Sequence, residues 1–208
     1  MTGTSHAVIG TASGFIVANY FSATPSATLL FMGLGLISGL IPDLDIDGKL
    51  SGRITISHKI IRSIAQLIGV LLITYSFYGG SDEERTIGIG IGLGMIILSS
   101  LIKQKHMLLI TGIGVVTGGY FLDEIWLFLL GIYIFISAWV PHRSYTHSII
   151  GLIFFGIIAF HLEAALDMKG IYYTCIIGYI SHLVADSKLL PFNKRGIPLF
   201  LPVSTKEI

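Results

Sequence analysis

The chain of 208 residues is 53% hydrophobic and only 12% charged, and its mean hydropathy is +0.82. About a quarter of the residues of an ordinary soluble domain are charged, so this composition excludes a soluble globular protein and indicates an integral membrane protein. The net charge of +1, without a basic stripe or tail, gives no basis for nucleic-acid binding.

Apolar segments long enough to cross a bilayer recur along the chain. A spanning helix needs about 20 mostly apolar residues, with a lower limit near 17. The sequence therefore predicts an all-α, polytopic transmembrane helix bundle of about eight segments, at 7–23, 26–41, 63–79, 86–102, 106–122, 124–141, 148–166 and 171–186. The segments at 86–102 and 106–122 are also compatible with a tilted or re-entrant path, so the expected count is six to eight.

The domain organisation follows from the short polar connections. The longest polar stretch, roughly 42–62, is too short to form a soluble domain. We therefore expect a single integral membrane domain over 1–208, with 63–137 as an extra helical region. The tail 187–208 is too short and too Pro-interrupted to span, so we expect it to lie in the interface or to fold back over the bundle.

The basic residues predict the orientation. If the segments alternate in direction, the side that holds the N-terminus carries all but two of the 13 Lys and Arg residues: Lys49, Arg53, Lys59, Arg62, Lys103, Lys105, Arg143, Lys188, Lys194, Arg195 and Lys206. Only Arg85 and Lys169 fall on the opposite side. By the positive-inside rule, both termini and the connections on their side are predicted to be cytoplasmic.

Histidines and aspartates gather on the same predicted side, although they come from distant parts of the sequence. The set comprises His6, Asp43, Asp45, Asp47, His58, His142, His147, His182 and Asp186. The acidic residues of the opposite side look like a solvated outer rim: Asp82, Glu83, Glu84, Asp123, Glu124, Glu163 and Asp167. This segregation by residue type predicts a shared site at one face of the membrane.

The strongest local pattern is the stretch Gly178-Tyr179-Ile180-Ser181-His182-Leu183-Val184-Ala185-Asp186. His182 and Asp186 are four residues apart and share one helix face, where they would chelate one metal ion or bridge two. The alternative is a hydrogen-bonded pair at a helix end. Ionisable groups near membrane depth are costly, which favours a functional role.

Two connections supply further candidate ligands. Pro42 is expected to end the second segment, and alternate positions of the extended chain after it place Asp43 and Asp45 on one side. Such carboxylates suit divalent cations, although acidic loop residues are commonly only solvated.

The second connection, Pro141-His142-Arg143-Ser144-Tyr145-Thr146-His147-Ser148, carries two imidazoles and a guanidinium before an apolar helix. Ser144 or Thr146 is expected to cap that helix, and a helix N-terminus beside Arg143 favours phosphate. The alternative is a capped loop in which Arg143 only follows the positive-inside rule. Taken alone, His6 is a weak candidate for the site, and so is the pair of His58 and Arg62. Their predicted position on the same side of the membrane as the other candidates strengthens the case for them.

These residues resemble a known family. His6, the stretch Leu40–Asp45, the stretch His142–Ser148, the stretch 178–186 and the closing Gly196-Ile197-Pro198-Leu199-Phe200-Leu201-Pro202 are similar, in this order, to the YdjM-like membrane-bound metal-dependent hydrolases. The resemblance covers roughly 1–62 and 138–203. That family looks distantly related to the zinc-dependent phospholipase C and P1 nuclease group.

The resemblance implies hydrolysis, for instance of a phosphoester, at a metal site built from His6, Asp43, Asp45, His142, His147, His182 and Asp186. His58 lies outside the matched motifs and is added as a further metal-ligand candidate. Mixed imidazole and carboxylate ligands make Zn²⁺ the first choice, with one to three ions.

We expect Arg143 and Arg62 to stabilise an anionic, lipid-like substrate. The competing hypothesis is a non-catalytic metal-binding membrane protein, either an ion carrier or a regulatory scaffold. A carrier would place its ligands near the bilayer midplane, whereas these cluster at one face.

Overall fold

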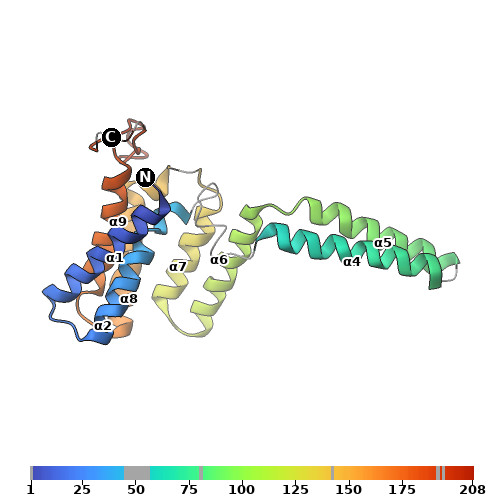
Figure 1. The fold of residues 1–208 in the computed structure, drawn as a ribbon, viewed down its shortest axis with the longest axis horizontal. Coiled ribbons are helices and arrows are strands. Elements are labelled where there is room, and N and C mark those ends of the chain that lie inside the picture. The colour runs from blue at the N-terminus through green and yellow to red at the C-terminus, as the bar shows by residue number, and fades with distance from the viewer. Residues whose placement is uncertain (1, 45–56, 80–81, 142, 191–192, 194) are drawn as a thin grey trace. The chain divides into compact units, whose positions relative to one another are not determined.

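The computed structural model describes the chain apart from residues 1, 45–56, 80–81, 142, 191–192 and 194 (Figure 1). The described residues form helices and no strands, which confirms the predicted all-α class. The helices are α1 (Gly3–Tyr20), α2 (Pro25–Ser38), α4 (His58–Gly79), α5 (Asp82–Ser100), α6 (Gln104–Phe121), α7 (Ile125–Ser137), α8 (Ile149–Leu166) and α9 (Ile171–Asp186), with 3-10 turns η1 (Ile41–Leu44) and η2 (Tyr145–His147).

The chain forms two compact units, one of residues 1–51 and 108–208 and the other of residues 52–107. In the second unit α4 and α5 pair as a helical hairpin (Figure 1). In the larger unit α7 packs on α6. At that contact a Cβ added to Gly112 would lie 2.8 Å from the Phe135 nitrogen. A single membrane domain over 1–208 with an extra helical region at 63–137 stays a prediction.

The number of spanning helices is smaller than predicted. Among the described residues two helices are long and apolar enough to cross a membrane, His58–Phe77 and Ile149–Leu166. The number rises to three if Arg85–Ser100 and Gln104–Phe121 count as one broken span. Apart from these, no described helix is both long and apolar enough to span alone, so the expected six to eight segments are not reached. The helices α2 and α7 are apolar but have only 14 and 13 residues. At 1.5 Å per residue such helices are about 20 Å long, less than the ~30 Å hydrocarbon core.

Close backbone approach of α1, α2 and α9 brings together chain segments that are distant in sequence. A Cβ added to Gly10 or to Gly35 would run into the other residue's carbonyl oxygen, so only glycine allows α1 to pack on α2 at this distance. A Cβ added to Gly178 of α9 would lie 2.9 Å from the same Gly35 oxygen. Small residues serve this purpose in membrane helix packing. The contacts bring the start of α1, the residues after α2 and the end of α9 to one end of the larger unit.

The start of α8 differs from the prediction. Ser148, rather than Ser144 or Thr146, caps this helix, because its hydroxyl accepts a hydrogen bond from the Gly151 amide at 3.4 Å. Ser144 and Thr146 lie too early in the chain, since η2 intervenes between them and the first helical residue.

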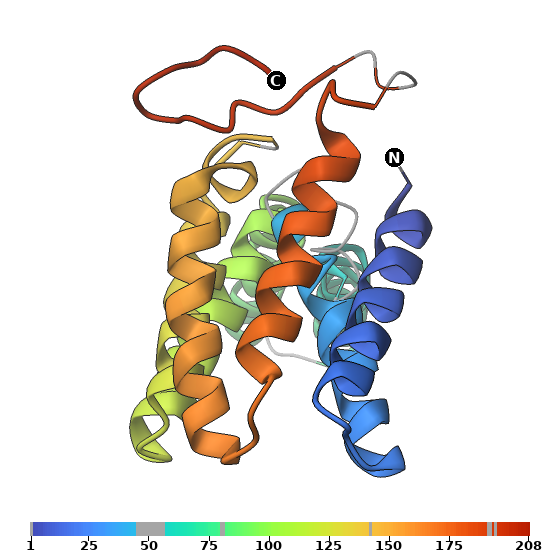
Figure 2. The same cartoon turned by 90° about the vertical axis from the view of Figure 1, so that its left-hand side faces the viewer.

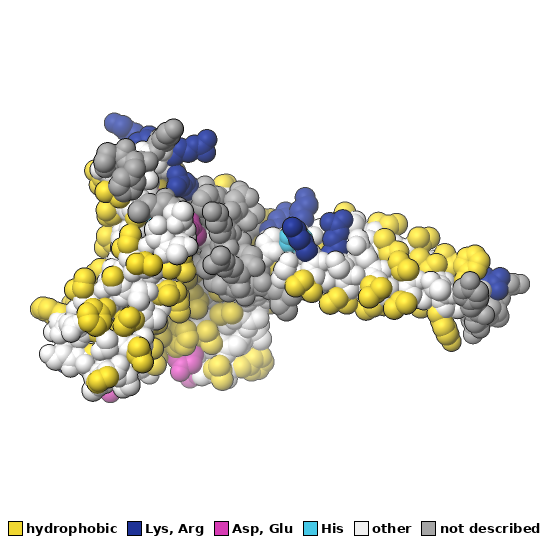
Figure 3. Space-filling view, viewed as in Figure 1, with side chains coloured by type: hydrophobic (Ala, Val, Ile, Leu, Met, Phe, Trp, Pro, Cys, Tyr) yellow, Lys and Arg dark blue, Asp and Glu magenta, His cyan; other side chains and the backbone are white. Residues whose placement is uncertain are grey.

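The C-terminal tail folds back over the bundle. The Ile149 amide donates to the Leu199 carbonyl at 2.9 Å, and the backbones of Ile197 and Ile208 bond to each other in both directions. Both chain termini lie at this end of the larger unit (Figure 2). On the face of this unit drawn in Figure 3, Lys and Arg side chains gather at the same end and acidic side chains lie mainly at the opposite end. Which end faces the cytoplasm stays a prediction.

Candidate metal centre

Five ionisable side chains meet at the end of the larger unit that holds the termini. They come from four elements: His6 from α1, Asp43 from η1, His147 from η2, and His182 and Asp186 from α9. The three histidines and Asp186 are at most 3% exposed, and the Asp43 side chain is 15% exposed. Burying such groups is costly unless they are paired or bind a metal.

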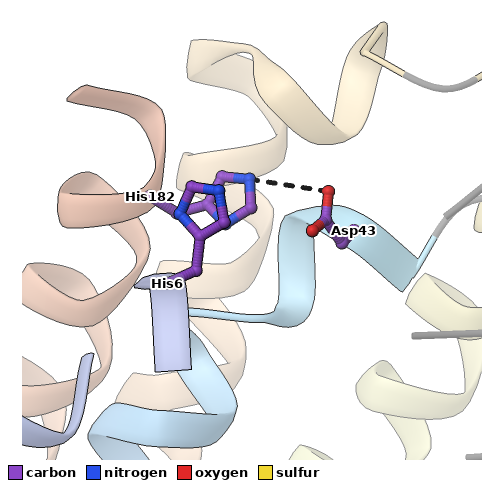
Figure 4. A group of neighbouring side chains, drawn as sticks. All are labelled: His6, Asp43 and His182. Carbon is purple, nitrogen blue, oxygen red and sulfur yellow. Dashed lines mark ion pairs between the residues drawn. The ribbon is translucent and has the colours of Figure 1, made fainter. Parts of the chain in front are cut away.

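Three ligand atoms form a compact triangle. The Nε2 atoms of His147 and His182 are 3.2 Å apart, and Asp43 Oδ1 lies 3.6 Å from the former and 3.7 Å from the latter. Figure 4 shows the carboxylate of Asp43 facing the ring of His182. The point equidistant from the corners of such a triangle lies about 2.0 Å from each, which matches zinc–nitrogen and zinc–oxygen bonds of about 2.0–2.2 Å.

The tautomer of His182 follows from its second ring nitrogen. Nδ1 of His182 lies 2.8 Å from the Gly39 carbonyl oxygen. A carbonyl oxygen only accepts hydrogen bonds, so Nδ1 carries the hydrogen, and the neutral ring presents a lone pair at Nε2. Metal-binding histidines are oriented in this way, with the outer nitrogen bonded to a carbonyl or carboxylate.

The second half of the cluster centres on Asp186. Its Oδ1 lies 3.2 Å from the Nε2 of His6, and its Oδ2 lies 3.0 Å from the Nη2 of Arg143 and 4.0 Å from the Nε2 of His182. The ring of His6 stacks on that of His182 with 3.8 Å between centroids. The Nδ1 of His6 is buried without a hydrogen-bond partner among the described residues. Asp186 thus joins the histidines to a guanidinium.

Asp43 is held in its ionised form. Burial raises the pKa of its carboxyl group, but the side chains of His147 and His182 lower the pKa by more, so the net value lies below the ordinary one. An ionised carboxylate is the form that binds a divalent cation.

Arg143 occupies an unusual backbone conformation. Its φ of 59° lies in the left-handed region, which is uncommon for residues other than glycine. The side chain is 27% exposed, so the guanidinium lies at the edge of the cluster and contacts both Asp186 and the surroundings. Strained conformations persist where the surrounding structure holds them, and they concentrate at functional sites.

The other predicted site residues are not brought into this cluster by the described structure. Asp45 and His142 lie outside the described residues. His58 and Arg62 belong to the 52–107 unit, where Nδ1 of His58 lies 2.8 Å from Oε1 of Gln104. Their roles at the site therefore stay predictions.

Sequence reasoning missed the residues that hold the turn of His147. Tyr179 is fully buried, and its hydroxyl donates to the Thr146 carbonyl and lies 3.1 Å from the Tyr133 hydroxyl. A Cβ added to Gly151 would lie 2.7 Å from the Tyr179 hydroxyl, so glycine leaves room for this contact. The available signal was the spacing, since Tyr179 precedes His182 by three residues and shares its helix face.

The donor set fits a divalent metal. It offers imidazole nitrogens and carboxylate oxygens and a fixed tautomer at His182, and the side chains of Asp43 and Arg143 are 15% and 27% exposed. Zinc accepts this combination of ligands.

The fold and this cluster define a helical membrane protein with a buried His/Asp centre at one end. The family model of the YdjM inner membrane protein matches residues 1–208, so the chain belongs to that family. This membership confirms the membrane assignment and its contact with the lipid bilayer. Neither a curated protein nor a solved structure matches the chain.

Proposed function

We propose that this chain is a membrane-bound, metal-dependent hydrolase that cleaves a phosphoester with activated water. The observation that carries the proposal is the triangle of His147 Nε2, His182 Nε2 and Asp43 Oδ1, whose edges of 3.2, 3.6 and 3.7 Å suit one zinc ion. A divalent ion bound there supplies Lewis acidity and lowers the pKa of water. The expected range of one to three ions, and the similarity to the zinc-dependent phospholipase C group, belong to this proposal.

The chain's own residues orient the reacting groups. Gly39 and the turn of Thr146 fix the rings of His182 and His147, and Arg143 holds Asp186 through its Nη2. A guanidinium presents its N–H groups as a planar fork that matches phosphate oxygens. Arg143 is therefore positioned to bind an anionic substrate at the exposed edge of the cluster.

Exposed aromatic residues near Arg143 support a substrate that resides in the membrane. Trp139 and Tyr145 flank Arg143 in the sequence and are 62% and 44% exposed. Trp and Tyr are enriched at the interface between hydrocarbon and water, where phosphate head groups lie. In this proposal the site works at the cytoplasmic interface, in line with the basic residues around it.

The test uses the full chain in nanodiscs. After metal removal and stepwise Zn²⁺ addition, hydrolysis of a phosphomonoester, a phosphodiester and phospholipids is measured for the wild type and His147→Ala. We expect metal-dependent hydrolysis of at least one substrate, lost in His147→Ala. His161→Ala is the matched control, since His161 packs edge-on against Phe160 in α8 and should leave activity unchanged.

The outcomes separate the competing functions. A wild-type protein that binds zinc stoichiometrically through His147 but hydrolyses none of these substrates would favour the non-catalytic reading, an ion carrier or a regulatory scaffold. A wild-type protein that binds no divalent metal would overturn both readings.

A further inference from the structure

An apolar cavity of about 110 Å³ lies between α7, η2 and the start of α8. Its lining carries no charged side chain. The residues are Tyr133, Ile136, Ser137, Val140, Tyr145, Thr146, Ile150, Gly151 and Phe154.

Three of the four hydroxyl groups in this lining, those of Tyr133, Ser137 and Thr146, are bonded to protein atoms. Ser137 Oγ donates to the Tyr133 carbonyl at 2.8 Å, and the Tyr133 hydroxyl pairs with that of Tyr179. An ordered water needs about two to four polar partners, and this lining offers mainly hydrocarbon. The cavity therefore favours an apolar occupant.

The upper end of the cavity adjoins the His/Asp cluster. Thr146 lines the cavity, and its Oγ1 lies 3.2 Å from Nδ1 of the next residue, His147. From this turn the lining follows α8 through Ile150 and Phe154, which are one helical turn apart, and runs from Val140 back into α7 as far as Tyr133. At 1.5 Å per residue the α7 part, from Tyr133 to Ser137, is about 6 Å long. The cavity runs from the level of the cluster along the helices.

The volume of the cavity and the residues at its opening indicate which kind of apolar molecule it holds. Ile136, Tyr145 and Ile150 are 44–48% exposed, so the cavity opens sideways toward the membrane. A helix of a second protein, about 10 Å across, is too wide for a space of this volume. A flexible alkyl chain fits, and its phosphate head group would lie at the depth of Trp139, Tyr145 and the cation Arg143.

We propose that this cavity holds an acyl chain of a membrane phospholipid substrate whose phosphate binds beside Arg143 at the cluster. The inference rests on the proposed function and names its substrate class, a lipid with an anionic phosphate and a long alkyl chain. Part of the binding free energy then comes from alkyl burial, so long-chain substrates should be cleaved in preference to short-chain phosphoesters.

The test is photo-crosslinking in nanodiscs with a phosphatidic acid probe that carries a diazirine in its acyl chain. Adducts mapped by mass spectrometry should concentrate at Ile136, Ile150 and Phe154 rather than at Ile110, which is 61% exposed on α6. Ile150→Trp, which fills the cavity, should lower labelling about fivefold or more, the order expected when one or two methylenes lose their apolar contacts. Ile110→Trp is the control and should leave labelling unchanged.

Head-group dependence is the second arm. Labelling of the cavity should fall when a diacylglycerol probe of equal chain length replaces phosphatidic acid, and also in Arg143→Gln. Adducts spread evenly over the lipid-facing helices, or equal labelling by the neutral probe, would overturn the proposal. Because crosslinking needs no turnover, cavity labelling in a protein that lacks hydrolysis would contradict the proposed function and leave the lipid site standing.

Discussion

Two carboxylates near opposite ends of the α8–α9 hairpin have different surroundings. Oε2 of Glu163 accepts hydrogen bonds from the backbone amides of Gly170 and Tyr172, at 3.0 and 2.8 Å. Asp186, at the other end, faces the side chains of His6, His182 and Arg143. The hydrogen bonds to these two backbone amides give Glu163 a structural role, because they link the end of α8 to the start of α9. The partners of Asp186 are ionisable side chains instead, and a cation would bind to its imidazoles.

The comparison corrects one expectation from the sequence. Glu163 was assigned to a solvated acidic rim, but its carboxylate is half-buried and bonded to the backbone. Sequence position alone does not separate a structural carboxylate from a candidate ligand. The type of donor around each one does.

The largest effect is expected from Asp186→Asn, which nearly preserves shape but removes the charge that offsets a divalent cation. Hydrolytic activity should fall by about 100-fold or more at unchanged protein level, and the zinc content of the purified protein should fall with it. Membrane insertion should stay intact because it depends on the apolar residues. Activity and metal content equal to those of the wild type would assign Asp186 the same structural role as Glu163.

Tyr179→Phe tests whether the buried hydroxyl positions His147. The change removes the donor to the Thr146 carbonyl, so zinc affinity, measured by chelator competition, should fall by about 10–100-fold. The absorption spectrum of the Co²⁺-loaded protein should shift, which a change in stability alone would not cause. Tyr173→Phe, at a half-exposed position of the same helix, is the control, and equal affinity in the two variants would contradict this role.

Glu163→Gln should lower stability and leave metal binding unchanged. A neutral amide oxygen accepts the Gly170 and Tyr172 amides less strongly than a carboxylate, so the free energy of unfolding should fall by about 1–3 kcal/mol. Denaturant unfolding in detergent measures this change. Zinc content and affinity should match the wild type, and a loss of metal would show that the two ends of the hairpin are not independent.

The smallest effect concerns the tail. Nζ of Lys188 lies 3.0 Å from Oε2 of Glu207, and this contact holds the pKa of the exposed Glu207 carboxyl below its ordinary value. A lowered pKa means that the stabilisation is present at neutral pH and is lost as the pH falls below the usual glutamate range, about 4.3. Glu207→Gln should slightly increase proteolysis of the tail at pH 7, and its difference from the wild type should shrink as the pH is lowered and Glu207 takes up its proton. An increase that is the same at every pH would rule out the ion pair as the cause.

Part of the candidate site could be predicted from helix periodicity and from the position of a helix-breaking proline. The spacing of His182 and Asp186 predicted one helix face, and both residues lie on α9. Pro42 predicted a helix end and an extended chain after it, but α2 already ends at Ser38 and Asp43 lies in the 3-10 turn η1. The structure brings these ionisable side chains together with His6 and His147, whose ligand roles belong to the proposed function.

Other features needed the three-dimensional structure. Tyr179 resembles any other aromatic residue in an apolar helix, and its hydroxyl partner is 33 residues away in the sequence. The number of spans was overestimated in part because hydropathy does not report where helices end: α2, α7 and α9 stop after 14, 13 and 16 residues.

The most direct test of the central claim is zinc K-edge X-ray absorption on the purified full chain. We predict about one or more equivalents of zinc with nitrogen and oxygen ligands at about 2.0–2.1 Å and outer-shell scattering from at least two imidazoles. His147→Ala should remove one imidazole from that signal. A purified protein without stoichiometric zinc after supplementation at neutral pH, or one whose zinc spectrum is the same in His147→Ala, would contradict the assignment of this cluster as a metal centre.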